Sequence, residues 1–365
     1  MSRRTNLISY ICTTALMLAS LFVVVNVCNT NYAELDLGVA VLILAGGALI
    51  SGFLNTLLHE LGHYFAGKRN GFVFSSMTVW FLRWSKIKNK VRFNFTLIGD
   101  EAGYTEMIPT TVDNVEKGLK SMARGGYITS LVLAIIGVPA LFVPNISVYL
   151  YSFWAMLFPI GVYFFCSSCF PSSTYGARND GAVVLGIKRG DDSTKVAINV
   201  LKIQAELYNG KTPCEIEEDL YFNLPQLPED DLNFALLLNA RYLYYLDKED
   251  FENAKKVTAR LLSITDYMPK EYAYSVKVDA LYNACTFDFD EQIADDLVYE
   301  LEKYLNNVNN STNVRAKLAY LLYVKREKEN ADIFYKKGVK EANKGQIKGL
   351  TLFERKLLDK MKEDF

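Results

Sequence analysis

The chain has 365 residues, of which half are hydrophobic and 22% are charged, and its formal net charge is −1. Residues 1–190 carry 15 Lys and Arg against 9 Asp and Glu, whereas residues 191–365 carry 25 against 32, so net charges of +6 and −7 nearly cancel. No basic run is interleaved with aromatic residues, which argues against a nucleic-acid partner, and the six scattered cysteines argue against a disulfide framework. The contrast between the halves indicates two domains, residues 1–190 and 191–365.

Four apolar runs in the first half are long enough to cross a membrane, at about residues 8–27, 37–66, 122–143 and 148–169. The first run follows two arginines, as a signal peptide would, but no small-residue cleavage site follows it. We therefore interpret it as a retained span, which gives a helical membrane bundle in contact with the lipid bilayer.

The positions of Lys and Arg predict how the four spans are oriented. Basic residues flank one end of every span: Arg3, Arg4, Lys68, Arg69, Lys117, Lys120, Arg124, Arg178, Lys188 and Arg189. The loops at residues 28–36 and 144–147 contain none. We expect a multi-pass protein of a bacterial cell membrane whose N-terminus and C-terminal domain are cytoplasmic.

The segment between the second and third spans has a different pattern. Residues 91–97 alternate apolar and polar with a period of two, which indicates a strand. Residues 72–84 are rich in aromatic and β-branched types, and residues 86–90 form a polar turn. We predict a small β-hairpin at the inner membrane surface.

From about Asp191 the sequence changes to amphipathic helices with polar connections. Ala254, Ala294 and Ala331 stand in similar contexts, 40 and 37 residues apart. This spacing suggests stacked helix pairs in a soluble, tetratricopeptide-like repeat domain, with a plain helical bundle as the alternative. The predicted fold class is therefore mostly α, a membrane bundle of about four spans with a small β-hairpin and a soluble helical domain.

The two histidines of the chain, His59 and His63, lie in the second apolar run as His59-Glu60-Leu61-Gly62-His63. At positions i and i+4 of a helix they share one face, which suits two ligands of one zinc ion. Glu60 lies beside them and can act as a general base toward water. Ionisable groups inside an apolar span are costly, so their presence indicates a functional site.

A zinc ion needs a third protein ligand, which must here be a carboxylate or a thiolate. Asp180 follows the fourth span on the same predicted side as His63, and Cys166 or Cys169 is the thiolate option. Asp100, Glu101 and Glu106 belong to the hairpin segment and are expected to be solvated.

Four segments resemble motifs of the site-2 protease family of intramembrane zinc metalloproteases. They are Leu57-Leu58-His59-Glu60-Leu61-Gly62-His63-Tyr64, Ala102-Gly103-Tyr104-Thr105-Glu106-Met107, Gly125-Gly126-Tyr127-Ile128-Thr129-Ser130-Leu131 and Asn179-Asp180-Gly181. Tyr127 and Ser130 depart from the third motif, and Pro171 stands nine residues before Asp180, farther than is usual in the family. The resemblance covers about residues 37–188.

The resemblance implies one Zn²⁺ per chain, with His59, His63 and Asp180 as ligands and Glu60 as the catalytic base. It implies hydrolysis of peptide bonds in transmembrane protein substrates, in regulated intramembrane proteolysis. Because a helix in lipid has its amides internally bonded, we expect the substrate to unwind and pair with residues 93–97. We assign Phe93, Phe95 and Asn179 to substrate contact, and a cytosolic protein partner to the helical domain.

Two other functions remain open. The first is a membrane scaffold without catalytic activity that binds partners through its helical repeats, although a structural metal site has no use for the glutamate. The second is a membrane metallopeptidase that trims lipidated or soluble substrates, which also uses a His-Glu-x-x-His run.

Overall fold

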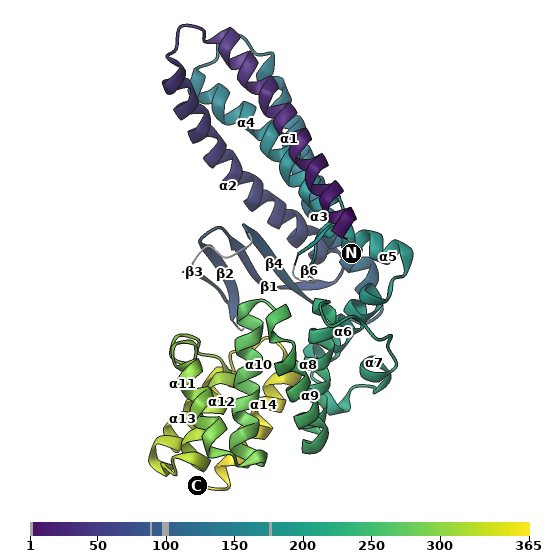
Figure 1. Ribbon diagram of the computed structural model, residues 1–365, viewed down its shortest axis with the longest axis vertical. Helices are drawn as coiled ribbons and strands as arrows, with labels where there is room; N and C mark the ends of the chain where they lie inside the picture. Colours follow the sequence, from purple (N-terminus) through teal and green to yellow (C-terminus); the bar gives the residue numbers. More distant parts are fainter. Residues whose placement is uncertain (1–2, 88–89, 97–101, 175–176) are drawn as a thin grey trace.

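The computed structural model describes residues 3–87, 90–96, 102–174 and 177–365. Within this part of the chain, four helices are long and apolar enough to cross a membrane. They are α1 (Arg3–Asn31), α2 (Leu37–Arg69), α3 (Val115–Gly137) with its 3-10 continuation η1 (Val138–Leu141), and α4 (Val148–Cys169). They pack side by side in one bundle (Figure 1). The mostly helical fold and the four spans are thus as predicted.

The third span begins earlier than its hydropathy suggests. We expected it to start near residue 122, whereas α3 begins at Val115 with two polar turns before its apolar part. Helices α2 and α3 approach each other closely where Gly62 meets Gly125, and a Cβ on either residue would overlap the backbone of the other. Close approach of this kind is how membrane helices gain van der Waals contact.

The predicted hairpin is part of a larger sheet. Four strands, β1 (Phe72–Val79), β2 (Leu82–Ile87), β3 (Lys90–Phe95) and β4 (Gly103–Pro109), pair antiparallel in the order β3-β2-β1-β4. Trp84 lies opposite Phe93 in β2–β3, and Thr78 lies opposite Tyr104 in β1–β4. The hairpin prediction was too small, because the pairing of β1 with β4 is not local in sequence. Leu97, Asp100 and Glu101 lie outside the described residues.

A short connection leads from α4 into the second half of the chain. Strands β5 (Ser173–Thr174) and β6 (Ala177–Arg178) form a two-stranded ladder, and α5 (Asp180–Arg189) follows. The side chain of Asn6 in α1 both donates to and accepts from the backbone of Ser173, which holds this connection against the first span.

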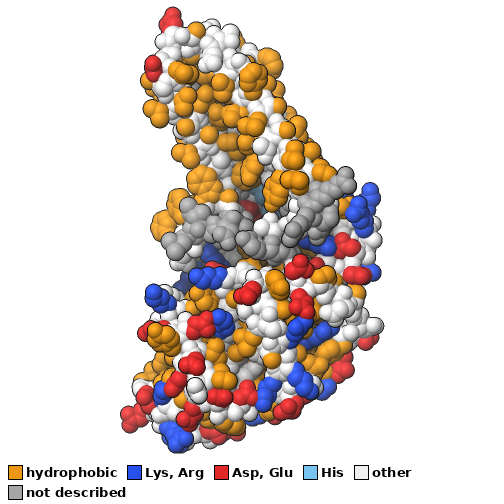
Figure 2. Space-filling model, in the orientation of Figure 1, with side chains coloured by type: hydrophobic (Ala, Val, Ile, Leu, Met, Phe, Trp, Pro, Cys, Tyr) orange, Lys and Arg blue, Asp and Glu red, His pale blue; other side chains and the backbone are white. Residues whose placement is uncertain are grey.

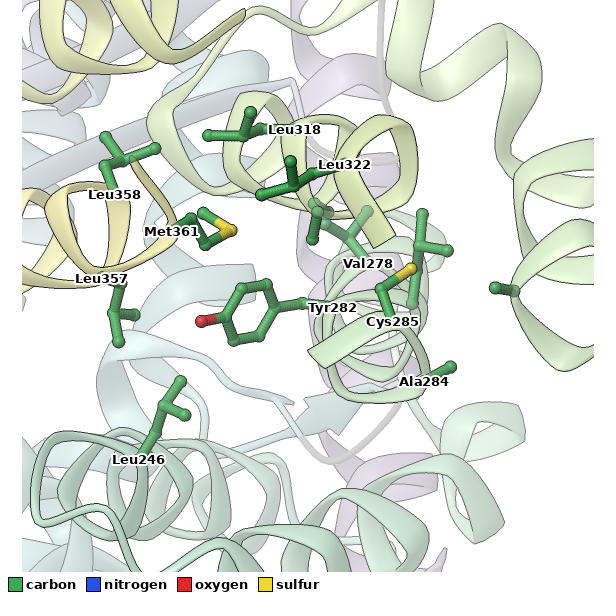
Figure 3. Packing of buried hydrophobic residues seen from close by; sticks show 14 of the residues in the cluster. Leu246, Val278, Tyr282, Ala284, Cys285, Leu318, Leu322, Leu357, Leu358 and Met361 are labelled. Atoms are coloured by element: carbon green, nitrogen blue, oxygen red, sulfur yellow. The ribbon is translucent and has the colours of Figure 1, made fainter. Parts of the chain in front are cut away.

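The remaining chain is helical. It contains α6 (Asp192–Asn209), η2 (Pro213–Glu215), α7 (Asp219–Phe222), α8 (Leu232–Asp247), α9 (Phe251–Ser263), η3 (Thr265–Tyr267), α10 (Lys270–Asn283), the π-helical turn η4 (Ala284–Asp288), α11 (Glu291–Asn307), α12 (Ser311–Ala319), the π-helical turn η5 (Tyr320–Val324), α13 (Lys328–Ala342) and α14 (Lys348–Lys362). Figure 3 shows Leu246 of α8 and Leu357 and Met361 of α14 around the ring of Tyr282 in α10. This core is continuous across helices far apart in sequence.

The three alanines that suggested a repeat occupy equivalent places. Ala254, Ala294 and Ala331 are fully buried near the starts of α9, α11 and α13. Each of these helices packs against the helix before it, giving the pairs α8–α9, α10–α11 and α12–α13. The structure therefore contains the expected succession of helix pairs.

The sheet lies between the membrane bundle and the helical region (Figure 1). Asn209 donates to the carbonyl oxygen of Thr110 at 3.0 Å, and Gln346 donates to that of Lys86 at 2.7 Å. Figure 2 shows a largely apolar surface on the bundle and mixed charges on the helical region. This contrast is what a membrane-embedded half and a solvated half require.

One ion pair fixes the start of the helical region. Arg178 donates to both carboxylate oxygens of Asp191, which also caps α6 through the amide of Thr194. Burial raises the pKa of Asp191, but these hydrogen bonds outweigh burial and hold the pKa below its ordinary value. The pair is therefore charged at neutral pH.

Candidate metal centre

The last third of α2 brings three chemically active side chains to one place. His59 and His63 lie one turn apart with their ring centroids 4.8 Å apart, and their side chains are only 8% and 12% exposed. Glu60 is also buried. A helix provides this arrangement because positions i and i+4 share a face.

Asp180, the first residue of α5, closes the site from the other side. Its Oδ2 lies 3.6 Å from Nε2 of His59 and 3.4 Å from Nε2 of His63. The potential ligand atoms of these three residues all lie within 4.8 Å of one another, which is a group that could hold a metal ion. Neither Cys166 nor Cys169 belongs to that group among the described residues. The structure thus brings together the two histidines and the aspartate that sequence reasoning selected.

Hydrogen bonds from α3 orient both imidazole rings. Nδ1 of His63 lies 2.7 Å from the carbonyl oxygen of Met122, and Nδ1 of His59 lies 2.9 Å from the hydroxyl of the fully buried Ser130. A carbonyl oxygen only accepts, so Nδ1 of His63 donates this bond and Nε2 is the ring nitrogen that faces Asp180. Partners of this kind set the tautomer of metal-binding histidines.

Gly126 leaves the space in which the two imidazoles meet Asp180. A Cβ at this position would overlap Nε2 of both His59 and His63. Sequence reasoning noted Gly126 and Ser130 as parts of a motif and assigned neither of them a role. The adjacent glycines at 125 and 126 could have indicated this role, because residues without side chains allow α2 and α3 to pack closely.

Strand β4 holds the carboxylate of Glu60. Thr105 donates from Oγ1 to Oε2 of Glu60 at 2.6 Å, and both side chains are buried. Gly103 lets the strand pass close to the helix, since a Cβ there would overlap the Glu60 carboxylate and the Thr56 side chain. Sequence reasoning missed Thr105. Glu106, expected to be solvated, is half-buried and accepts from the hydroxyls of Ser75 and Ser76.

Asn179 positions Asp180. Its Oδ1 accepts from the amides of Ala182 and Ser172, and its Nδ2 donates to the carbonyl oxygens of Ser167 and Phe170. These four bonds cap α5 and tie it to the end of α4. These bonds engage both the oxygen and the nitrogen of the Asn179 amide, and the assignment of Asn179 to substrate contact stays a prediction.

Phe93 and Phe95 lie on the surface of the sheet. Both are exposed residues of β3, 49% and 75% respectively. In the strand order β3-β2-β1-β4, β3 is at the edge opposite to β4, and β4 is the strand that contacts Glu60. Their assignment to substrate contact stays a prediction. Period-two alternation identifies a strand, but it does not reveal which strand of a sheet faces a helix.

Comparison of the chain with protein-family models, curated proteins and solved structures found no match.

Proposed function

We propose that this protein is a zinc metalloprotease that hydrolyses peptide bonds of membrane-anchored proteins. The observation that carries the proposal is the convergence of His59, His63 and Asp180 beside the buried carboxylate of Glu60. These residues lie in and next to a helix that is long and apolar enough to cross a membrane. Buried ionisable groups in such a helix are retained for function.

The three side chains fit a zinc ion in a catalytic site. Catalytic zinc sites use three protein ligands from imidazole and carboxylate and leave a position open. Bonds of ~2.0–2.2 Å at tetrahedral angles separate the ligand atoms by about 3.3–3.6 Å. The distances of 3.4 and 3.6 Å from Asp180 Oδ2 to the two imidazole nitrogens agree with this spacing.

A zinc ion held there would supply a Lewis acid that polarises the scissile carbonyl and makes water a stronger nucleophile. Glu60 takes the proton of the attacking water and returns it to the leaving amine nitrogen. Thr105 holds one oxygen of that carboxylate on the side of β4. A structural metal site needs no base beside its ligands, so Glu60 argues against the non-catalytic scaffold.

We further propose that an unwound substrate segment pairs with β4. A helix in lipid cannot be attacked while its amides are internally bonded, and adding a strand to an exposed sheet edge is a common way to hold an extended peptide. β4 is an edge strand whose residues 103 and 105 contact Glu60. This moves the proposed pairing from residues 93–97 to β4.

The helical region is proposed to bind a cytosolic protein or the cytosolic part of the substrate. Helix α6 packs against β4 and α3, and Asn209 at its end donates to Thr110 just after β4. A partner on the helix pairs would therefore lie on the side of the sheet away from the bundle (Figure 1). Stacked helix pairs commonly bind peptides in this way.

The test is zinc content and proteolysis of the full-length protein purified in detergent. The unaltered protein should hold about one zinc per chain and cut single-span membrane proteins, with the cut positions found by mass spectrometry. His59→Ala and His63→Ala should lose the metal, because ligands are needed for binding itself. Glu60→Gln should keep the metal and lose cleavage, because a base is needed only for turnover.

Glu116→Gln is the matched control, since it makes the same change at an exposed position in the first turn of α3. It should keep both metal and cleavage. Full proteolysis by Glu60→Gln would contradict the proposed role of Glu60 as the general base. Cleavage of soluble or lipidated peptides without cleavage of spanning substrates would favour the metallopeptidase that trims such chains.

A further inference from the structure

An open groove of about 670 Å³ lies between α2 and α3, and none of its lining residues belongs to the metal centre. Its walls are apolar, with Leu58, Leu61 and Phe65 from α2 and Ile128 from α3. Phe65 and Ile128 are 62% and 50% exposed, as expected for side chains that face lipid. The volume is in the range of sites that bind small molecules or parts of larger ones.

Three cations line the same groove. Lys117, Lys120 and Arg124 stand at positions i, i+3 and i+7 of α3 and so share one face of that helix. Among the described residues, no Asp or Glu lines the groove. None of the three cations forms an ion pair with a carboxylate in residues 3–87, 90–96, 102–174 and 177–365. The groove therefore has an excess positive charge that the described side chains lining it do not balance.

The cations of the groove lie at the level of the headgroup layer of a bilayer leaflet, and its apolar walls lie at the level of the hydrocarbon layer. α3 is part of a candidate span, and the residues after Arg124 are its apolar part. The cations lie along the first turns of the helix, where a span leaves the hydrocarbon and enters the headgroup layer. At that end, Asn70 donates to the hydroxyl of Ser121 across the groove at 3.0 Å. Long Lys and Arg side chains there keep their stems on apolar surface and their charges among headgroups.

We propose that this groove binds one anionic phospholipid, with its phosphate against Lys117, Lys120 and Arg124 and an acyl chain along Leu58, Leu61, Phe65 and Ile128. Basic pockets between membrane helices recognise anionic headgroups by this combination of charge and apolar surface. A free anion in solution would contact only the cations. It would leave the apolar walls of the groove without an apolar partner. The proposal does not depend on the proteolytic activity proposed above.

The experiment uses the full chain in phosphatidylcholine nanodiscs that contain a smaller share of phosphatidylglycerol. Two photoactivatable probes, a phosphatidylglycerol and a phosphatidylcholine with the same diazirine in one acyl chain, are cross-linked and mapped by mass spectrometry. The phosphatidylglycerol probe should label peptides of α2 and α3 that contain the groove residues about tenfold more than the phosphatidylcholine probe. The triple variant Lys117→Gln, Lys120→Gln, Arg124→Gln should remove this preference.

The control is the triple variant Arg69→Gln, Lys188→Gln, Arg189→Gln, which removes three exposed cations outside the groove. It should keep the preference. If the first triple variant fails to fold, Lys120→Gln alone should weaken labelling by the phosphatidylglycerol probe about fivefold. Equal labelling by both probes, an equal loss in both triple variants, or competition by inorganic phosphate would overturn the proposal.

Discussion

The hydroxyl of Thr105 donates a 2.6 Å hydrogen bond to Oε2 of Glu60, joining the edge strand of the sheet to the helix that carries both histidines. Both side chains are buried, so the bond forms away from bulk water, where a hydrogen bond to a charged acceptor is strongest. The sheet is therefore part of the site. The position of β4 determines where the proposed base is held.

Replacing Thr105 by Val removes the hydroxyl and keeps the shape of the side chain. A hydrogen bond to a charged group contributes about 1.5–3 kcal/mol, so we expect cleavage to fall roughly 10- to 100-fold. Zinc content should not change, because Thr105 contacts no proposed ligand. Thr105→Ser keeps the hydroxyl and should retain most of the activity. Normal turnover by the Val variant would show that Glu60 does not need this positioning.

Adding a methyl group at Gly126 tests the space at the metal centre. The Cβ of Gly126→Ala would overlap Nε2 of both His59 and His63. We expect zinc content to fall by more than about tenfold, because misplaced second-layer groups typically cost metal affinity 10- to 100-fold. Gly46→Ala in α2 is the control, since its Cβ would meet nothing within 4 Å. Zinc retained by Gly126→Ala, with helicity unchanged by circular dichroism, would contradict the proposed site.

Local patterns in the sequence predicted the features that depend on neighbouring residues. Hydropathy found the four spans, and the i, i+4 spacing put His59 and His63 on one face. Capping also follows from local sequence, as where Asn179 precedes α5. Asp180 required more than local pattern, because it lies 117 residues after His63 in sequence. It was selected from the few carboxylates and thiols on the predicted inner side of the membrane, with help from the family resemblance.

Contacts between distant segments could not be predicted from such patterns. Ser130 and Thr105 reach His59 and Glu60 across 71 and 45 residues of sequence. A period of two shows that a segment is a strand, but strand order depends on pairings such as β1 with β4.

Removing the side chain of Asn179 tests its role in positioning Asp180. Asn179→Ala loses four hydrogen bonds that hold the start of α5 against the end of α4. We expect zinc affinity to fall about tenfold or more, measured by competition with a chelator, while Glu60 stays in place. Ser147→Ala removes the corresponding cap of α4 and should leave zinc affinity unchanged. A similar loss in both variants would mean that general destabilisation is responsible.

The core of the helical region contains two carboxylates and one guanidinium. Arg315 is fully buried, and it donates to Glu354 at 3.1 Å and to Asp279 at 3.4 Å. Its guanidinium carbon lies 4.1 Å from the centre of the Tyr282 ring, and Nη1 has no hydrogen-bond partner among the described residues. One cation cannot balance two buried carboxylates, so protonation of one of them is favoured.

Burial, helped by the nearby charge of Glu354, raises the pKa of Asp279 to about 7 against the opposing effect of Arg315. The folded protein then keeps a proton that the unfolded chain releases at its lower, ordinary pKa. The contribution of Asp279 to stability should therefore be fully present below the unfolded pKa and be lost as pH rises to about 7, by on the order of 1–4 kcal/mol. The measurement is the urea concentration at which the buried thiol of Cys285 becomes reactive in the full chain.

The side chain of Asp279→Asn cannot titrate, so this variant should flatten the dependence of stability on pH. Asp266→Asn makes the same change at an exposed position and should leave that dependence unchanged. An unchanged slope in Asp279→Asn would assign the proton to another group.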